Sequence, residues 1–472
     1  MDLRKKGRHE NVISLIPGTF MMLFPLQLDR LFRSIVVVLM LVLTGCMDQV
    51  VNVQNDAEMP EAGLSKARNT HLAEQAVRAA GKDGDMTAVV FAIDPYKIVD
   101  RYKIVDRYKI VDRYKIVDRY KIVDRYKIVD RYEFTDAFYG YSVWVATDYL
   151  DEFMAEMGAD ETIAWVEPVF PTSAPRGSMK KMSSTQRVPW SVQEVGGTDS
   201  WTVSGDGSGD VDVDVFIIDT GVNNTDLNVV DSRDFSGSSS AYDVDGHGTN
   251  IAGIIGAIDN DRGSVGIAPG ARIHNYRVFD DNGVGDDTYV IAALENVLQW
   301  KAANPSSPAV VNLSLGVEVG LGHTALDDAV QSVINAGITV VVASGNDEKD
   351  AATIAPAHVA DALTVGSYAK NDAFSWFSNF GPLVDILAPG ENVFSLAPGY
   401  GFSEMSGTSM AASHVTGSVA LYLAQHPDAS PQQVRDALLA SSEGRKTIKR
   451  VPSGTTDKSV WVGLNSFASS QN

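Results

Sequence analysis

Long apolar runs in the C-terminal part of the chain predict the elements of a buried core. The segment Val215–Ile218 is apolar throughout and rich in β-branched residues, which is typical of a buried strand. The segments His247–Ile258 and Met410–Leu423 are longer and contain many Ala, Gly and other small or apolar residues, so they predict helices buried on most sides. A polar residue, Asp219, directly follows the strand.

A second group of elements is expected nearer the N-terminus. Alternating or continuous apolar residues predict strands at Ala88–Ile93, Tyr139–Ala146 and Ile163–Phe170. The segment Asp148–Met157 has the spacing of an amphipathic helix. Together they predict a small α+β domain over residues 88–175, separate from the larger apolar region.

A perfect repeat interrupts this small domain. The hexapeptide YKIVDR occurs six times between Tyr96 and Arg131. In a strand, the period of six places both polar and apolar residues on each face. In a helix, successive copies are rotated by about a third of a turn, so their apolar residues do not form one stripe. We interpret residues 96–131 as an insertion of variable length, tolerated because loop closure costs rise slowly with length. The alternative is a β-solenoid-like or strand-adding adhesive segment.

The N-terminus has the pattern of an export signal. Two arginines precede the apolar run Ile35–Leu43, which is well short of the about 20 residues that a membrane-spanning helix needs. Small residues follow, and Leu43–Cys46 resembles a bacterial lipobox, in which the cysteine is lipidated. Cys46 is the only cysteine of the chain, which fits a lipid anchor and excludes an intrachain disulfide. We therefore expect a signal peptide over residues 1–46 and a polar tether over 47–87.

Charge narrows the range of partners. The 472 residues carry 60 acidic and 39 basic side chains, a net charge of −21. Such a field repels phosphates, so nucleic-acid binding is not expected. The composition fits an exported bacterial protein, held at the cell envelope through Cys46 or secreted.

Three polar residues next to the apolar elements supply the parts of a hydrolytic triad. Asp219 ends a strand, His247 begins a helix, and Ser409 directly precedes another helix. A serine hydroxyl attacks a carbonyl only when a base takes its proton, and a carboxylate orients that base. Backbone N–H groups in the first turn of the second helix can stabilise a developing oxyanion.

The order Asp, His, Ser and the motifs DTG, HGT and SGTSMA resemble the subtilisin-like serine proteases. Further matching segments are VVNLSLG (Val310–Gly316), VVASGN (Val341–Asn346) and SNFGPLVDILAPG (Ser378–Gly390), several of them closest to the proteinase K branch. The resemblance implies a three-layer α/β fold around a mainly parallel sheet over residues 188–472. It also implies a serine endopeptidase that acts on protein or peptide substrates and needs no cofactor for catalysis.

The resemblance assigns further site residues. Asn346 matches the asparagine whose amide donates to the oxyanion. Two segments match the strands that flank an extended substrate. These substrate-binding residues are Gly283, Val284, Gly285, Ser314, Leu315 and Gly316.

Other positions matter to metal binding and specificity. Asp385 matches a calcium ligand of the proteinase K branch, with the remaining ligands supplied by carbonyls near Ala360 and Ala362, so a structural calcium is expected. Asp286 and Asp287 flank one substrate segment and motivate the hypothesis that basic side chains upstream of the cut are preferred.

The chain departs from the family pattern without losing a catalytic group. Asn250 stands where a second histidine is usual, Ser413 replaces a common proline, and Val317 replaces a frequent glycine. Val317 is expected to narrow the pocket for the residue before the cut.

The small domain resembles the inhibitor-type, ferredoxin-like prodomain of the same family. The resemblance implies that residues 88–175 act as an intramolecular inhibitor and that a Pro-, Ser- and Lys-rich linker, residues 176–187, is cut during maturation. The competing interpretation is a non-catalytic surface protein whose prodomain permanently fills the cleft. The intact triad and Asn346 argue against it.

Overall fold

The computed structural model describes residues 86–93, 129–160, 162–173, 178–180, 185–463 and 466–467. All of them lie in one compact unit of the chain, Leu64–Asn472. The predicted signal peptide with Cys46, nearly all of the predicted tether and most of the YKIVDR array lie outside the described residues. Within the described ranges, no helix combines the length and apolarity required to cross a bilayer.

A seven-stranded sheet forms the centre of the larger domain, and its paired strands are parallel. The predicted strand at Val215–Ile218 is confirmed as β7, which lies inside the sheet. In spatial order the strands are β16 (Ile386–Pro389), β15 (Leu363–Tyr368), β13 (Thr339–Ala343), β11 (Ala309–Leu313), β7 (Asp214–Asp219), β9 (Arg272–Arg277) and β8 (Val229–Asp234).

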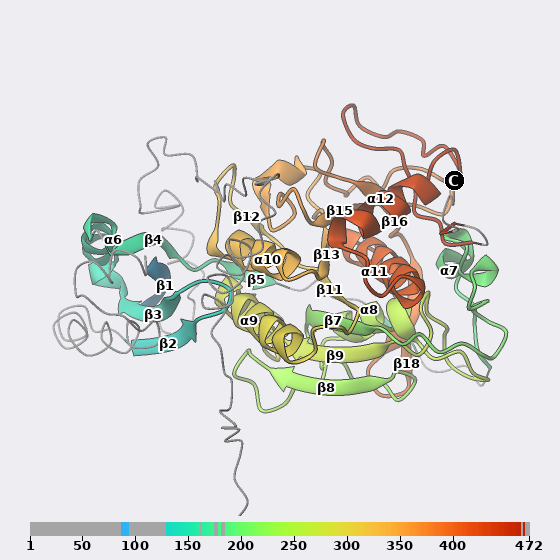
Figure 1. Ribbon diagram of the computed structural model, residues 1–472, viewed down its shortest axis with the longest axis horizontal. Helices are drawn as coiled ribbons and strands as arrows, with labels where there is room; N and C mark the ends of the chain where they lie inside the picture. The colour runs from blue at the N-terminus through green and yellow to red at the C-terminus, as the bar shows by residue number, and fades with distance from the viewer. Residues whose placement is uncertain are drawn as a thin grey trace, which may run out of the picture. The chain divides into compact units, whose positions relative to one another are not determined.

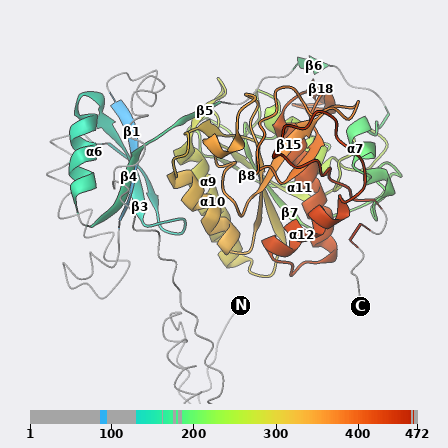
Figure 2. The same ribbon diagram turned by 90° about the horizontal axis from the view of Figure 1, so that it is seen from above.

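Helices cover both faces of this sheet, so the expected three-layer α/β fold is confirmed. Alternate residues of β7 point to opposite faces: Val215 and Ile217 join one buried cluster, and Phe216 and Ile218 join another. The first cluster includes α8 (His247–Gly256) and α11 (Thr408–Gln425). The second includes α9 (Asp287–Ala303) and α10 (Ala325–Asn335), which lie side by side in Figures 1 and 2. The helices α7 (Trp190–Glu194) and α12 (Pro431–Ser441) add side chains to the first cluster and complete the described α-helices of the domain.

Both predicted core helices are confirmed with small changes at their ends. The helix expected over His247–Ile258 ends at Gly256, and the one expected over Met410–Leu423 extends to Thr408 and Gln425. The carboxyl ends of β7, β11 and β13 meet at one edge of the sheet because the strands are parallel. Polar residues that follow these strands are thereby brought together.

The small domain is an antiparallel sheet with a helix on one face. Its strands, in the order β2-β3-β1-β4, are β2 (Val129–Phe134), β3 (Gly140–Ala146), β1 (Met86–Ile93) and β4 (Ile163–Pro168). Val89, Phe91 and Ile93 pack against α6 (Leu150–Ala159). Ala88, Val90 and Ala92 lie in the same buried cluster as side chains of α9 and α10. The three predicted strands and the predicted helix are therefore present.

The structure corrects one detail of the repeat interpretation. The array was expected to be an insertion between the first strand and the rest of the small domain, yet its last residues, Val129–Arg131, begin the edge strand β2. The buried anchor of that strand is Phe134, which lies just beyond the array. The C-terminal end of the final copy is therefore part of the sheet, because its backbone pairs with β3.

Three small sheets lie outside the central sheet. Strand β10 (Val284–Asp286) pairs with β5 (Pro171–Ser173), and β12 (Val317–Glu318) pairs with β14 (Ile354–Ala355). The hairpin of β17 (Val393–Ala397) and β18 (Gly401–Met405) accepts β6 (Ser178–Lys180) at its edge. Residues that follow the small domain therefore pair with two separate edges of the larger domain.

Candidate active site

The carboxylate of Asp219 and the imidazole of His247 form a direct pair. Asp219 Oδ1 lies 2.8 Å from His247 Nδ1, and both side chains are fully buried. Asp219 is the last residue of β7, and His247 is the first residue of α8 after the helix cap Gly246. The same oxygen accepts the Thr220 N–H at 2.7 Å, which holds the carboxylate in place.

Ser409 lies in the first turn of α11, with its side chain at the mouth of a cavity. Its hydroxyl donates to the Ser314 carbonyl at 3.3 Å. His247 Nε2 has no hydrogen-bond partner among the described residues.

Asn346 is held with its oxygen turned inward. Its Oδ1 accepts the Thr408 N–H at 2.8 Å and the Thr408 hydroxyl at 3.0 Å. These contacts leave the amide nitrogen as the group that can donate into the cavity that Asn346 and Ser409 both line. The position suits a donor to an oxygen that gains negative charge next to Ser409.

A cavity of about 260 Å³ opens beside Ser409. The predicted residues Ser314, Leu315 and Gly316 line one wall, and Val317 lines it as well. Ile354 packs on that wall, since a Cβ added to Gly316 would lie 2.9 Å from its Cγ2. The cavity thus lies beside Ser409, and both polar and apolar residues line it.

The comparisons with known proteins agree with this geometry. The family model described as "Subtilase family" matches residues 210–460. An extracellular serine proteinase of a Thermus species is 37% identical over 308 residues, which is 62% of this chain and 70% of that protein. The chain belongs to the subtilase family.

Further relatives are serine proteinases as well. Alkaline serine exoprotease A of Vibrio alginolyticus is 41% identical over 53% of this chain and 45% of its own length. Among solved structures, a cold adapted subtilisin-like serine proteinase is 35% identical over 58% of this chain and 97% of that chain, with a TM-score of 0.49. With the family established and relatives at this identity, this subtilase is a serine endopeptidase, and its substrates are proteins or peptides.

Sequence reasoning missed two residues that hold the site of this subtilase in place. The buried Asp243 accepts the Gly246 and Thr249 N–H groups at the start of α8 and the Thr220 hydroxyl. Asn379 accepts the Asp347 N–H and donates to the Ser344 carbonyl, so it fixes the loop that carries Asn346. Asp243 was visible as an acidic residue before a helix start, and Asn379 lies in the matching segment Ser378–Gly390, but the sequence did not show that its side chain contacts the loop of Asn346.

The predicted substrate segment Gly283–Gly285 is a sheet edge, and the chain that follows the small domain lies on it. Val284 pairs with Ser173 and Gly285 with Thr172 in antiparallel register. Gly285 has to be glycine, because an added Cβ would lie 2.5 Å from the Val278 carbonyl oxygen. An extended peptide therefore has a backbone edge to pair with at this position.

Asp286 and Asp287 have roles within the chain, and the hypothesis that they favour basic side chains in a substrate stays a prediction. Asp286 caps α9, and its carboxylate accepts the Thr288 and Tyr289 N–H groups. Asp287 is fully buried, and its Oδ1 accepts the Phe170 N–H at 3.3 Å. Both carboxylates therefore accept hydrogen bonds from backbone N–H groups of this chain. An acidic residue is favourable at the start of a helix, where N–H groups lack partners within the helix.

The departures from the family motif are accommodated by local hydrogen bonds. Asn250 donates to the Ser403 hydroxyl and so ties α8 to the β17–β18 hairpin. The Ser413 hydroxyl donates to the Ser409 carbonyl one turn earlier in α11. His414 is buried beside it, and burial lowers the pKa of its imidazole to about 4 although its contact with the Met410 carbonyl raises it. It is therefore neutral and structural.

The oxygens expected to bind calcium at Asp385 contact an arginine of the chain. Arg435 of α12 extends its guanidinium into the group of oxygens where the ion was expected: it donates to the Ala360 carbonyl at 2.8 Å, the Ala362 carbonyl at 3.0 Å and Asp385 Oδ1. Burial raises the pKa of Asp385 to about 6, although Arg435 and the Thr364 N–H lower it. The guanidinium of Arg435 supplies the positive charge that pairs with the buried Asp385 carboxylate. These oxygens therefore do not fit an additional cation.

Removing this guanidinium is expected to expose a cation site. We expect Arg435→Ala to lower the free energy of unfolding by about 3 kcal/mol, because it leaves a buried carboxylate unpaired. We also expect added Ca²⁺ to raise the melting temperature of Arg435→Ala more than that of the wild type. Calorimetry with Ca²⁺ or a chelator measures both effects. The double variant with Asp385→Ala should lose the extra response, and an equal response in wild type and Arg435→Ala would contradict the prediction.

Proposed function

We propose that this subtilase is a self-processing endopeptidase in which Ser409 is the nucleophile and His247 the general base. The observation that carries the proposal is the buried 2.8 Å contact between Asp219 and His247, which begins α8, a helix that packs against α11, the helix of Ser409. The cavity beside Ser409 adds a place for the side chain that precedes the cut bond. Similarity of the motifs supports placement in the proteinase K branch.

The residues present account for each step of acyl transfer. His247 Nε2 takes the hydroxyl proton of Ser409 as Oγ bonds to the substrate carbonyl carbon, and Asp219 stabilises the resulting imidazolium. The amide nitrogen of Asn346 and the Ser409 N–H donate to the oxyanion. The imidazolium then gives its proton to the leaving amine as the C–N bond breaks. Water repeats the sequence, releases the acid and restores the serine.

The pKa of His247 provides a test of its role as base. Burial alone lowers this pKa, but Asp219, Asp245 and Asp243 together outweigh burial and raise it. Only the neutral imidazole accepts a proton, so activity rises with pH through this pKa. Asp245→Asn removes a negative charge and lowers the pKa, and we expect the acidic limb of kcat/KM to move to lower pH.

A pH series on a peptide amide measures the effect. Asp436→Asn on α12 is the matched control, because it changes the net charge equally while Asp436 is not among the groups that act on His247. An acidic limb that stays in place in Asp245→Asn would show that His247 does not limit the reaction.

Contacts between the small domain and the catalytic domain support its proposed role as an intramolecular inhibitor. The Glu295 carboxylate on α9 accepts the Thr135, Asp136 and Ala137 N–H groups at 2.9, 2.7 and 2.6 Å. In return, Glu167 of β4 accepts the Ala325 N–H at the start of α10. Charged acceptors on N–H groups form strong hydrogen bonds, and a carboxylate at a helix start is favourable.

The chain between the two domains supports self-cutting. Ser173 is paired to β10, whereas Ser178 is paired to β18, the strand that leads to Ser409. A peptide paired at both of these edges presents the bonds between its two held segments for cutting. We therefore expect the first cut between Ser173 and Ser178, at the start of the linker predicted over residues 176–187.

We further propose that Cys46 carries a lipid that holds the protein at the cell envelope. The lipobox-like Leu43–Cys46 and the absence of any other cysteine support this assignment. Metabolic labelling with a fatty acid tests it, with Cys46→Ser as the control.

A serine-reactive fluorophosphonate tests the proposed activity directly. We expect it to label one residue, Ser409, in the processed protein and to stop hydrolysis of peptide substrates. A non-catalytic protein with a permanently filled cleft would stay unlabelled at Ser409 and hydrolyse no peptide even after the small domain has been removed.

A further inference from the structure

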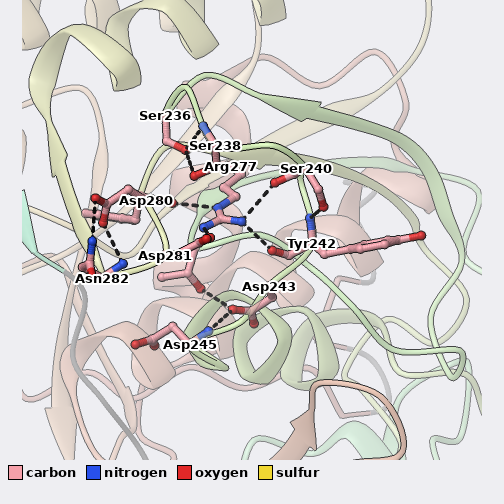
Figure 3. A network of polar contacts seen from close by, with 12 residues as sticks. Ser236, Ser238, Ser240, Tyr242, Asp243, Asp245, Arg277, Asp280, Asp281 and Asn282 are labelled. Carbon is pink, nitrogen blue, oxygen red and sulfur yellow. Dashed lines mark hydrogen bonds and ion pairs between the residues drawn. The ribbon is translucent and has the colours of Figure 1, made fainter.

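Arg277 is a buried cation that the proposed reaction does not use. It is the last residue of β9, and its side chain is 2% exposed. Burying a guanidinium is costly unless its N–H groups are satisfied. Arg277 satisfies its groups with backbone carbonyls and a carboxylate from two different loops, and Figure 3 shows it between them.

The first loop leads to the catalytic histidine. Arg277 Nη1 donates to the Ser240 carbonyl at 3.0 Å and the Tyr242 carbonyl at 2.8 Å. This loop has few apolar anchors: the Tyr242 and Val244 side chains are 66% and 53% exposed. Its contacts with the sheet are therefore polar, and Arg277 provides two of them.

The end of this loop is joined to the helix of His247. Asp243 follows Tyr242 directly, and its carboxylate accepts the Gly246 N–H at 2.8 Å and the Thr249 N–H at 2.9 Å. A shift of Tyr242 is thus passed to the start of α8, where His247 is the first residue.

The second loop leads to the substrate strand. Arg277 Nε donates to the Phe279 carbonyl at 2.7 Å, and Nη2 donates to Asp281 Oδ1 at 2.6 Å. Asp280, between them, accepts the Val284 N–H at 3.0 Å and donates its own N–H to the Val284 carbonyl at 2.8 Å. The loop is therefore closed onto the first residue of β10.

We propose that Arg277 is a positioning residue that fixes the distance between the His247 loop and the substrate strand β10. The inference rests on the proposed function, because it takes these two loops as walls of the substrate cleft. A planar guanidinium reaches both loops at once with donors in fixed directions. A lysine has a single charged nitrogen and can keep only part of this arrangement.

Substrates of different length separate positioning from general stability. A tetrapeptide amide pairs with β10, whereas a single-residue ester reaches only Ser409 and the adjacent cavity. We expect Arg277→Met to lower the ratio of their kcat/KM values by at least about tenfold and Arg277→Lys to lower it less. The Asp281→Asn control removes one exposed charge and keeps the carbonyl contacts, so its ratio should stay within about twofold. Equal losses on both substrates in Arg277→Met and Arg277→Lys would overturn the proposal.

Hydrogen exchange of the full chain in the Ser409→Ala background tests the same inference without any activity. We expect Arg277→Lys to speed exchange in residues 236–246 and 280–286 together and to leave α11 unchanged. Faster exchange in one loop alone, or in α11 as well, would overturn the coupling. If the wild type cuts neither substrate, the proposed function fails, and the exchange result still decides whether Arg277 joins the loops.

Discussion

The Ser409→Ala protein is expected to remain a single uncut chain, whereas the wild type separates into a small-domain fragment and a catalytic fragment. Without the hydroxyl no acyl-enzyme forms, and catalysis of peptide hydrolysis should fall by about 10⁴- to 10⁶-fold. Alanine removes only the hydroxyl and the hydrogen bond to the Ser314 carbonyl, so the fold should persist. Intact mass and N-terminal sequencing of the fragments measure the result.

Ser413→Ala is the matched control for this experiment. Ser413 lies one turn further along α11, is equally buried and donates to the Ser409 carbonyl, so it has the same surroundings without a role in attack. We expect it to be cut as the wild type is. Cutting of Ser409→Ala at the same bonds would mean that another protease does the processing, and an uncut wild type would favour the permanently filled cleft.

The sequence predicted the catalytic fold well because its signals are local. The run Val215–Ile218 is apolar at every position, as expected for a strand that faces helices on both sides, and β7 is such a strand. The helices of His247 and Ser409 were predicted within two residues at each end. The edge strand β2 was missed because half of it lies in the last YKIVDR copy. That copy is identical in sequence to the others, so nothing in it indicated a strand at this position.

The sequence could indicate a site residue where a short motif surrounds it, but not where its role depends on contacts with residues distant in sequence. Asp286 and Asp287 have the composition of an acidic subsite, but their orientation is set by the start of α9 and by Phe170, which pattern alone does not reveal. Asp385 was assigned to calcium because it matches a calcium ligand of the resembling family, and the sequence did not show that Arg435, 50 positions away, would contact it. Arg277 had no signal at all, since its importance comes from two loops that meet only in the folded chain.

Replacing Asn346 is expected to lower kcat by about 10²- to 10³-fold with little change in KM. The amide nitrogen can donate to an oxygen that becomes negative only in the transition state, so its loss leaves ground-state binding intact. Thr408 holds the amide oxygen from the other side, and this fixes which end of the amide faces the cavity. Steady-state kinetics of Asn346→Ala on a tetrapeptide amide measure the effect.

Asn346→Asp separates donation from structure. Its carboxylate keeps an oxygen that accepts the Thr408 N–H, but it replaces the donor with a negative charge, so kcat should fall at least as far as in Asn346→Ala. A peptide boronate, which resembles the tetrahedral intermediate, should lose affinity for Asn346→Ala by about the same factor as kcat. If Asn346→Asp instead kept wild-type kcat, the contact with Thr408 would be the whole role of this residue, and the oxyanion would depend on backbone N–H groups alone.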